Sequence, residues 1–215
     1  MTKTILFDLD GTLTDPKIGI TNSVKYALSK FGIEVKDRTI LYPFIGPPLV
    51  DSFMEYYHFS LEEAEKALQY YREYFSKGGM FENEVYEGIE DMLSSLNDRG
   101  IDLYVATSKP EEYSVKILEH FGLGKYFKKI VGATMDEKRN KKEDIIEYAL
   151  RENKIDTQFA VMVGDRKFDI LGGKKFGLKT VGVTFGYGGE DELSDAKADY
   201  IATSVLELRK LLLEI

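Results

Sequence analysis

Two acidic residues follow an apolar run near the start of the chain. In the segment KTILFDLDGTLTD, residues 3–15, the run Ile5–Phe7 leads into Asp8 and Asp10, which are one residue apart. Carboxylates buried at the end of an apolar strand cost free energy unless a cation or a hydrogen-bond donor compensates for them. The pair therefore needs partners from elsewhere in the chain if it forms part of a site.

Further polar residues follow other predicted strands. Thr107 and Ser108 end one apolar run, while Asp165 and Asp169 follow another. In a parallel α/β sheet, sites form beyond the carboxyl ends of the strands, so these residues can converge on one edge. Carboxylates at close range cannot all ionise without a cation, and oxygen ligands without His or Cys suit Mg²⁺. The pattern predicts a Mg²⁺ site built from aspartates.

Each of these pieces alone also has a plain structural interpretation. An Asp-Gly pair after a strand is typical of a turn, and Thr107-Ser108 can cap the helix that follows. GDRKFD, residues 164–169, can be a turn that places an acid at a helix N-terminus. The lysines at 141 and 142 are typical of solvated surface. Their occurrence in order at strand ends favours one common site.

A parallel sheet must position these residues. Apolar and β-branched runs alternate with helical patterns from residue 86 onward, which is typical of a sheet covered by helices on both faces. The helical patterns include residues 87–100, 111–122 and 142–153. The predicted strands are residues 5–7, 101–107, 129–134, 159–165, 180–186 and 199–203.

Residues 16–82 interrupt this alternation. They contain no convincing strand, and the apolar periodicity predicts helices at 20–31, 50–59 and 61–75. The glycine pair at 78–79 gives the returning chain backbone freedom. We therefore predict an α/β core of residues 1–15 and 83–215 and an inserted helical domain of residues 16–82.

Composition excludes several classes of protein. The net charge of −8 argues against broad binding to nucleic acid or to an anionic membrane, and the lack of cysteine excludes disulfides and thiolate chemistry. No apolar run approaches the roughly 20 residues that span a bilayer, and we recognise no signal segment before the first strand. We expect a cytoplasmic protein, a monomer or a homodimer.

Taken together, the motifs resemble those of the haloacid dehalogenase superfamily. DLDGT, residues 8–12, is similar to its first motif, Thr107 in VATSKP to its second, a lysine in RNKKED to its third, and residues 164–169 to its fourth. The insertion resembles the helical cap of this family. The resemblance implies a Rossmann-like parallel sheet core with an inserted helical-bundle cap.

The resemblance implies catalytic roles for the first two aspartates. Asp8 would attack phosphorus and become an aspartyl phosphate. Asp10 would protonate the leaving oxygen and then take a proton from the hydrolytic water. Residues two apart on an extended strand point the same way, so both carboxylates can flank one phosphoryl group.

The resemblance also implies the ligands of the phosphate. Gly11 would let the backbone turn so that N–H groups face phosphate oxygens. Thr107 would hydrogen-bond the phosphate with Ser108 beside it, and a lysine would neutralise charge on the nucleophile and the phosphoryl group. Lys142 fits the start of the following helical period better, and Lys141 remains the alternative.

For the metal, the resemblance implies Mg²⁺ held by Asp8, by the carbonyl of Asp10 and by Asp165. Asp169 would bind the ion directly or orient its ligands. The implied activity is hydrolysis of a small phosphorylated metabolite.

The branch of the family follows from finer features. Dehalogenases of this kind lack the second carboxylate, which is present as Asp10, and mutases carry a cap histidine where this chain has Ile20. No cap lysine is marked as a Schiff-base former for phosphonate hydrolysis. FIGPPL, residues 44–49, resembles the phosphoglycolate phosphatase branch, and a 5'-nucleotidase-like phosphatase is the alternative.

Two other classes stay open. One is a binder that keeps the fold without hydrolysis, although no motif residue is missing, and the other is a phosphotransferase with an acceptor other than water. The aromatic residues of the insertion favour packing of a small bundle over stacking on a nucleobase. Asp15 has no assigned chemical role. It is expected either to cap the first inserted helix or to mark a hinge.

Overall fold

Residues 3–215 are described by the structure of the protein, which is a computed structural model. The chain divides into a core unit, formed by the described residues up to Asp15 together with Val85–Ile215, and a helical unit, Pro16–Glu84. The chain returns to the core unit after Glu84, whereas the sequence suggested a boundary after residue 82. Among residues 3–215, no helix combines the length and the apolar character needed to cross a membrane.

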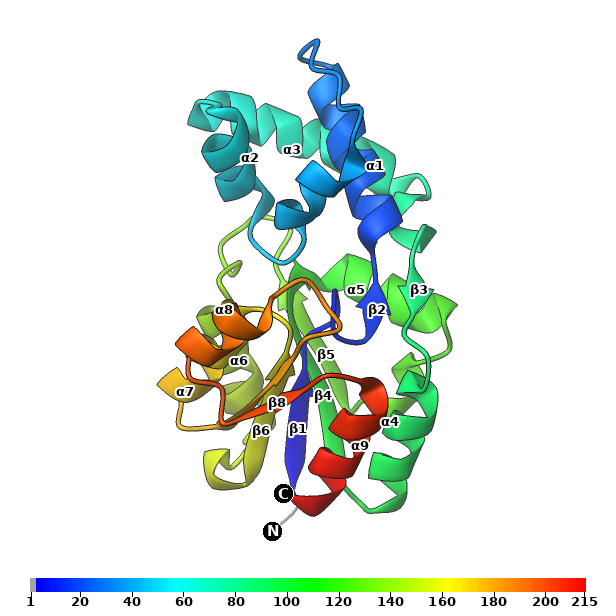
Figure 1. Cartoon of the computed structure of the whole chain (residues 1–215), viewed down its shortest axis with the longest axis vertical. Helices are drawn as coiled ribbons and strands as arrows, with labels where there is room; N and C mark the ends of the chain where they lie inside the picture. The colour runs from blue at the N-terminus through cyan, green and yellow to red at the C-terminus, as the bar shows by residue number, and fades with distance from the viewer. Residues whose placement is uncertain (1–2) are drawn as a thin grey trace. The chain divides into compact units, whose positions relative to one another are not determined.

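A six-stranded sheet with parallel neighbours forms the centre of the core unit (Figure 1). Its order is β5-β4-β1-β6-β7-β8. Because β1 lies between β4 and β6 and is covered on both faces, all four of its residues are buried. The strands are β1 (Thr4–Phe7), β4 (Asp102–Pro110), β5 (Lys129–Ala133), β6 (Ala160–Gly164), β7 (Lys179–Val183) and β8 (Tyr200–Ala202).

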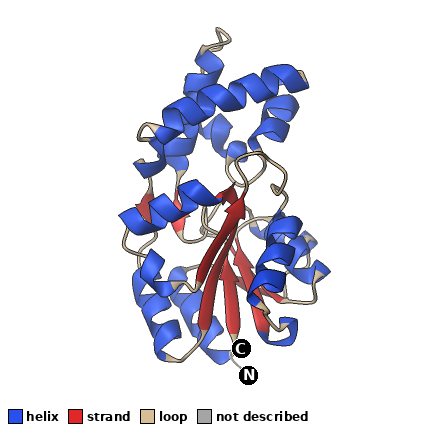
Figure 2. Ribbon diagram, turned by 180° about the vertical axis from the view of Figure 1, so that it is seen from behind, coloured by secondary structure: helices blue, strands red, loops and turns tan. Residues whose placement is uncertain are grey.

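Helices cover both faces of this sheet, with α4, α5 and α9 on one face and α6, α7 and α8 on the other (Figures 1 and 2). The change of face occurs where the chain leaves β5 and enters β6 beside β1. Ligand sites of open α/β sheets lie at such a reversal of strand order. The helices are α4 (Ile89–Asp98), α5 (Glu111–His120), α6 (Lys142–Asn153), α7 (Lys167–Lys175), α8 (Glu190–Asp195) and α9 (Val205–Glu214), with 3-10 turns η3 (Gly124–Tyr126) and η4 (Thr157–Phe159).

The packing of α6 shows how the sequence pattern becomes structure. Ile145, Ile146 and Ala149 are fully buried and pack with Leu6 and Met162 of the sheet. These positions recur at the helical period, so one face of α6 is apolar along its length. That face fixes the helix against the sheet and thereby places its first residue at the sheet edge.

The helical unit consists of α1 (Lys17–Ser29), α2 (Leu49–Tyr57) and α3 (Leu61–Ser76), with 3-10 turns η1 (Arg38–Phe44) and η2 (Gly79–Phe81). Helix α3 begins at a capping box, in which the side chains of Ser60 and Glu63 bond each other's backbone N–H groups. The short strands β2 (Thr14–Asp15) and β3 (Glu84–Val85) pair where the chain leaves and re-enters the core unit.

An aromatic cluster fills the interior of the helical unit. Phe53 is fully buried, with its ring 5.1 Å from that of Phe44 and 6.0 Å from that of Phe59. The rings of Phe31 and Phe59 are 4.6 Å apart, and those of Phe44 and Tyr57 are 6.0 Å apart. Such contacts are those of a packed core. We call these five residues the aromatic cluster.

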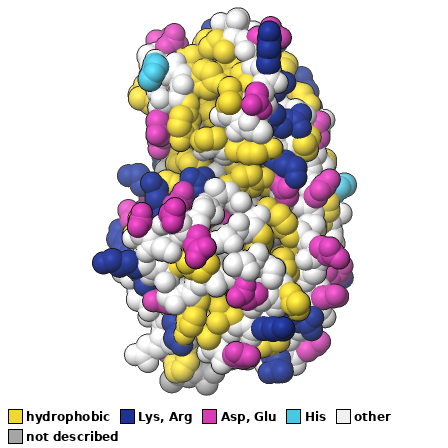
Figure 3. Space-filling view, viewed as in Figure 1, with side chains coloured by type: hydrophobic (Ala, Val, Ile, Leu, Met, Phe, Trp, Pro, Cys, Tyr) yellow, Lys and Arg dark blue, Asp and Glu magenta, His cyan; other side chains and the backbone are white. Residues whose placement is uncertain are grey.

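The surface of the helical unit also carries apolar side chains, as Figure 3 shows.

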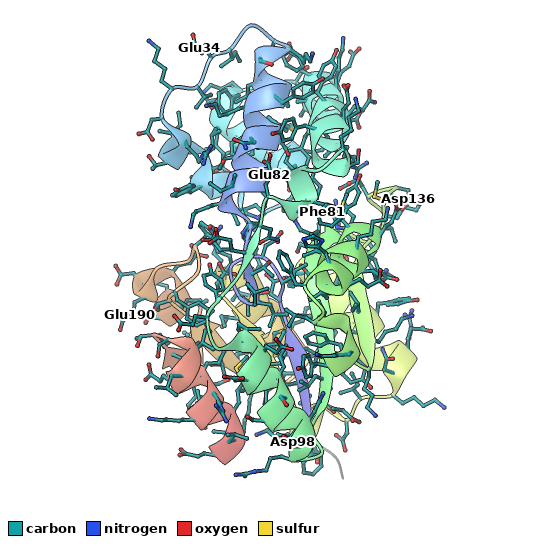
Figure 4. All side chains as sticks on the ribbon, turned by 90° about the vertical axis from the view of Figure 1, so that its right-hand side faces the viewer. Glu34, Phe81, Glu82, Asp98, Asp136 and Glu190 are labelled. Carbon is teal, nitrogen blue, oxygen red and sulfur yellow. The ribbon has the colours of Figure 1, made fainter. Side chains whose placement is uncertain are left out.

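A polar network lies near the end of the unit: the Glu82 carboxylate accepts hydrogen bonds from Asn22 Nδ2 at 2.8 Å and from Tyr74 Oη at 3.0 Å. Arg38 Nη2 donates to Asn22 Oδ1 at 3.0 Å. Figure 4 shows Glu82 close to the ribbon of α1. On the surface of the helical unit, the exposed large apolar side chains are those of Ile40, Met54, Tyr56, Leu61 and Phe81.

Candidate active site

The carboxyl ends of β1, β4 and β6 lie side by side. The residue before Asp8 pairs with Val105 of β4 and with Val163 of β6. Thr107 stands two residues beyond Val105, and Asp165 stands two residues beyond Val163. The parallel register therefore brings polar residues from three distant segments to one edge of the sheet.

Three aspartates meet at this edge in an arrangement that could hold a metal ion. One carboxylate oxygen from each of Asp8, Asp165 and Asp169 lies within 4.8 Å of the others, and all three residues are buried. We call them the carboxylate cluster. Burial and the neighbouring charges of Asp8 and Asp169 raise the pKa of Asp165 well above its usual range. Burial likewise raises the pKa of Asp169 to about 6.

Lys142 is the cation inside this cluster. Its Nζ lies 2.8 Å from Asp8 Oδ1 and 2.7 Å from Asp169 Oδ1, and it donates to the carbonyl oxygen of Ala106 at 3.0 Å. Burial lowers the pKa of the ammonium group, but Asp169 and Asp8 outweigh burial and leave that pKa raised. Lys142 opens α6 and is buried, whereas the preceding Lys141 is exposed. Of the two lysines, only Lys142 therefore reaches the aspartates.

Lys109 is a second buried cation at the site, and the sequence reasoning missed it. Its Nζ lies 2.6 Å from Asp10 Oδ2. Burial raises the pKa of Asp10, and the charge of Lys109 limits that rise. Alternation along β4 gave only a weak signal for Lys109, because the register between β4 and β5 shifts between Thr107 and Pro110. Asp10 Oδ1 is buried and has no hydrogen-bond partner within residues 3–215.

The turn after β1 is held against Asp165. Gly11 has φ +81°, and a Cβ at this position would overlap Asp165 Oδ2, so both conformation and space require glycine. The Gly11 N–H donates to the carbonyl of Thr14 at 2.8 Å and is thus engaged inside the turn. Thr12 Oγ1 donates to Asp165 Oδ1 at 3.4 Å. The turn that follows β1 thus holds Asp165, which follows the neighbouring strand β6, in place.

The expected phosphate ligands from β4 differ in their surroundings. Thr107 is buried, and its Oγ1 accepts a hydrogen bond from the N–H of Lys109 at 3.3 Å. Ser108 is half-buried, and the described part of the chain offers its hydroxyl no hydrogen bond. Ligation of the metal through the Asp10 carbonyl stays a prediction, since the Asp10 side chain pairs with Lys109 instead of joining the carboxylate cluster.

Charge and donor chemistry at the edge fit Mg²⁺. When all four buried carboxylates, counting Asp10, are ionised, two buried ammonium groups face them, which leaves two negative charges for a divalent cation to offset. Asp8 Oδ1 and Asp169 Oδ1 meet Lys142 at ion-pair distance but without hydrogen-bond geometry. Oxygen donors of this kind are those that Mg²⁺ prefers.

Comparison with known proteins identifies the family. Residues 5–183 match the haloacid dehalogenase-like hydrolase family, and the chain belongs to that family. The match includes segments of both the core unit and the helical unit. The expected family, the α/β fold with its parallel sheet and the enzyme class, a phosphatase of this family, are confirmed.

Characterised relatives span nearly the whole chain. A 5'-nucleotidase from Pseudomonas aeruginosa is 43% identical over 208 residues, which cover 97% of this chain and 94% of that protein. The tyrosine-protein kinase PtkA from Mycobacterium tuberculosis is 36% identical over 211 residues, covering 97% and 72%. A phosphoglycolate phosphatase from Vibrio parahaemolyticus is 25% identical over 214 residues, covering 96% and 94%.

Solved structures agree with this assignment. The crystal structure of a protein described as a predicted phosphatase, from Clostridium acetobutylicum, superposes with a TM-score of 0.97 at 53% identity and covers 100% of both chains. A haloacid dehalogenase-like hydrolase from Streptococcus pneumoniae has a TM-score of 0.90 at 31% identity, with 98% of each chain covered.

Proposed function

We propose that the protein is a Mg²⁺-dependent phosphatase that hydrolyses a small phosphomonoester through an aspartyl phosphate on Asp8. The observation that carries this proposal is the position of Asp8. Its carboxylate lies in the carboxylate cluster with Asp165 and Asp169 and contacts Lys142 Nζ at 2.8 Å. A nucleophile flanked by a cation and by a metal site suits attack on a phosphoryl group.

Asp8 performs the first step. An oxygen of its carboxylate forms a bond to phosphorus, while the bond between phosphorus and the leaving oxygen breaks. Lys142 contacts the same carboxylate and offsets the negative charge that gathers between nucleophile and phosphoryl group. Removal of this lysine leaves Asp8 and Asp169 facing each other without a cation between them.

Asp10 moves the proton. Its pKa is raised by burial, and Oδ1 is without a hydrogen-bond partner in residues 3–215, so this oxygen can carry a proton toward the leaving group. In the second step the same carboxylate takes a proton from the water that attacks the aspartyl phosphate. Lys109 pairs with the other oxygen, Oδ2, and holds the side chain in one orientation.

The metal would be held by Asp8, Asp165 and the Asp10 carbonyl, with Asp169 beside them. When bound, Mg²⁺ supplies charge that polarises the phosphoryl oxygens. Thr107 donates a hydrogen bond to a phosphate oxygen, and Gly11 shapes the turn that brings Asp8 and Asp165 together. The helical unit serves as a cap that excludes bulk water during the reaction.

Nucleoside monophosphates are the first substrates to test, because a 5'-nucleotidase is 43% identical to this chain while a phosphoglycolate phosphatase is 25% identical. Phosphoglycolate remains the second candidate, supported by the segment FIGPPL, residues 44–49. Both are small phosphomonoesters, so both agree with the same chemistry on Asp8.

A second candidate function is transfer of the phosphoryl group from Asp8 to the hydroxyl group of an acceptor molecule instead of to water. The 36% identity to a tyrosine-protein kinase favours this possibility. The test adds a tyrosine-containing peptide to a turnover reaction and measures phosphotyrosine. Formation of phosphotyrosine that depends on Asp8 would support transfer, whereas inorganic phosphate as the sole product would support hydrolysis.

The test of the main proposal is a phosphatase screen with Mg²⁺. Nucleoside monophosphates, phosphoglycolate, sugar phosphates and pyrophosphate are each incubated with wild-type protein and with the Asp8→Asn variant. We expect release of inorganic phosphate by the wild type from one substrate class, and none by the variant. Binding of these compounds without release would instead support a binder of phosphorylated ligands.

A further inference from the structure

The loop after β7, residues 184–189, contacts both the carboxylate cluster and the segment where the chain leaves the core unit. Tyr187 makes the two contacts by itself. Its backbone N–H donates to Asp165 Oδ2 at 2.8 Å, and its hydroxyl donates a hydrogen bond to Asp15 Oδ1. Asp15 is the last core residue before the helical unit begins. One residue thus joins the exit segment, through its side chain, to a predicted metal ligand, through its backbone.

The same loop touches the point of return. Phe185 packs edge to face on Tyr86, with ring centroids 5.1 Å apart and ring planes at 69°. Tyr86 follows Val85, the first residue of the returning segment, and its N–H donates to the carbonyl of Leu13 at 3.3 Å. The segment that leaves the core unit contacts Tyr187, and the segment that returns to it contacts Phe185, two positions away in the same loop.

The loop backbone lies directly against the site. A Cβ at Gly186 would overlap the carbonyl oxygen of Gly11 and the Cβ of Asp165, so glycine is required for this close approach. Contacts this tight leave no free space between the loop and Asp165. A movement of the loop toward the site must therefore displace Asp165 or the turn after β1, and a movement away must break the hydrogen bond from the Tyr187 N–H to Asp165.

The Tyr187 hydroxyl is also suited to remain a donor. Burial and the hydrogen bond to Asp15 both raise the pKa of the phenol above its ordinary value. The proton therefore stays on the tyrosine oxygen, which donates to the Asp15 carboxylate. A hydrogen bond to a charged acceptor is stronger than one between neutral groups.

We propose that Tyr187 is a positioning residue that couples the exit segment at Asp15 to the metal ligand Asp165. Occupation of the metal site then orders the exit segment, and an ordered exit segment in turn strengthens metal binding, because coupling between two sites is reciprocal. The inference rests on the proposed function only in taking Asp165 as a ligand of Mg²⁺. It assigns no step of the chemistry to Tyr187.

Hydrogen–deuterium exchange with and without Mg²⁺ tests the coupling. In the wild type we expect Mg²⁺ to slow exchange in peptides that cover residues 12–18 and residues around Asp165. In Tyr187→Phe, we expect the response at residues 12–18 to decrease while the response around Asp165 persists, because the direct contact between Thr12 and Asp165 remains. Calorimetric titration should show Mg²⁺ affinity reduced about fivefold or more in this variant.

Two further variants make the test specific. Asp15→Ala removes the acceptor, and its effect on Mg²⁺ affinity should equal that of Tyr187→Phe and should not add to it in the double variant. Tyr86→Phe is the matched control, because it removes a nearby tyrosine hydroxyl that has no hydrogen bond within residues 3–215. Melting temperatures establish that each variant is folded.

Several results would overturn the inference. These are an unchanged Mg²⁺ response at residues 12–18 in Tyr187→Phe, additive losses in the double variant, equal losses in Tyr86→Phe, and a wild type that binds no Mg²⁺. Phosphate release is measured separately. A wild type that binds Mg²⁺ and shows the coupling, yet hydrolyses nothing in the screen, would refute the proposed hydrolysis and leave the coupling supported.

Discussion

The carboxylate cluster and the centre of the aromatic cluster, Phe44 and Phe53, are both buried, but they are built from opposite kinds of side chain. In the core unit, Asp8, Asp165 and Asp169 crowd negative charge into the interior. In the helical unit, Phe44, Phe53 and their neighbours bury rings that pack on one another. The first arrangement costs free energy unless a ligand compensates for it, whereas the second stabilises the fold unaided.

This difference separates residues kept for chemistry from residues kept for packing. Substitution in the carboxylate cluster should destroy activity with little loss of stability, because the fold gains little from crowded charge. Substitution in the aromatic cluster should do the reverse. The following variants test this contrast, in order of decreasing effect.

Asp8→Asn should lower kcat by about 10⁴-fold or more, since the amide cannot attack phosphorus. Lys142 keeps Asp169 as a partner at 2.7 Å, so no buried cation is left unpaired and the melting temperature should change by only a few degrees. Steady-state phosphate release and thermal unfolding measure the two effects. Wild-type turnover in this variant would remove Asp8 from the role of nucleophile.

Phe53→Ala should reduce the free energy of unfolding of the helical unit by about 3–5 kcal/mol, because Phe53 is fully buried and its loss leaves a cavity beside Phe44 and Phe59. Urea unfolding followed by tyrosine fluorescence and by far-ultraviolet circular dichroism measures the change. Tyr56→Ala, at a neighbouring ring that is 44% exposed, is the control and should cost less. Equal losses in both variants would contradict a packed aromatic core.

Lys109→Met should lower kcat by roughly 10- to 100-fold, because Asp10 loses the charged partner at 2.6 Å that orients it. The value of KM should change less than kcat, since the orientation of Asp10 matters for proton transfer and not for substrate binding. Kinetics with a single aryl phosphate give both constants. A rise in KM alone would instead make Lys109 a substrate ligand.

Mg²⁺ affinity should fall by about tenfold between pH 7 and pH 5, because a proton on Asp169, whose pKa is raised to about 6, competes with the metal. The same shift means that the folded metal-free protein holds this proton more tightly than the unfolded chain. Its stability should therefore decrease as the pH rises through 6, and Mg²⁺ should reverse the decrease. Calorimetric titration measures the change in Mg²⁺ affinity, and thermal unfolding in EDTA measures the change in stability of the metal-free protein. A Mg²⁺ affinity that does not depend on pH would contradict the prediction.

Lys141→Ala should have the smallest effect, within about twofold in kcat/KM, because its side chain is exposed and surface charges contribute little. Lys142→Ala is the paired variant and should lose most of the activity. The two measurements together decide which lysine serves the site. A larger loss from Lys141→Ala than from Lys142→Ala would reverse the assignment.

The sheet could be predicted because each buried strand is a nearly continuous apolar run, and α6 because its buried positions repeat at the helical period. Helix α9 was overlooked although Ser204 caps it and Leu208 and Leu212 are buried on one face. Turn η1 was also overlooked, although the Asp37 side chain accepts the N–H of Thr39 and starts this 3-10 turn.

The site could be predicted only where sequence position fixes the side chain. Asp8, Asp165 and Lys142 follow from strand ends and from a helix start, and the structure brings them together. Lys109 lies where the register between β4 and β5 becomes irregular, so its burial depends on neighbouring backbone. Tyr187 contacts Asp165 through a loop whose shape no local pattern specifies.

The central place of β1 determines when the active site can first exist during synthesis. Residues 4–7 emerge from the ribosome before both of their partners, because β4 and β6 follow only at residues 102–110 and 160–164. The helical unit is continuous in sequence and can fold in the interval. Strand β1 is apolar and cannot pair on both sides until β6 has been made, so it is exposed to chaperones and to aggregation in the interval.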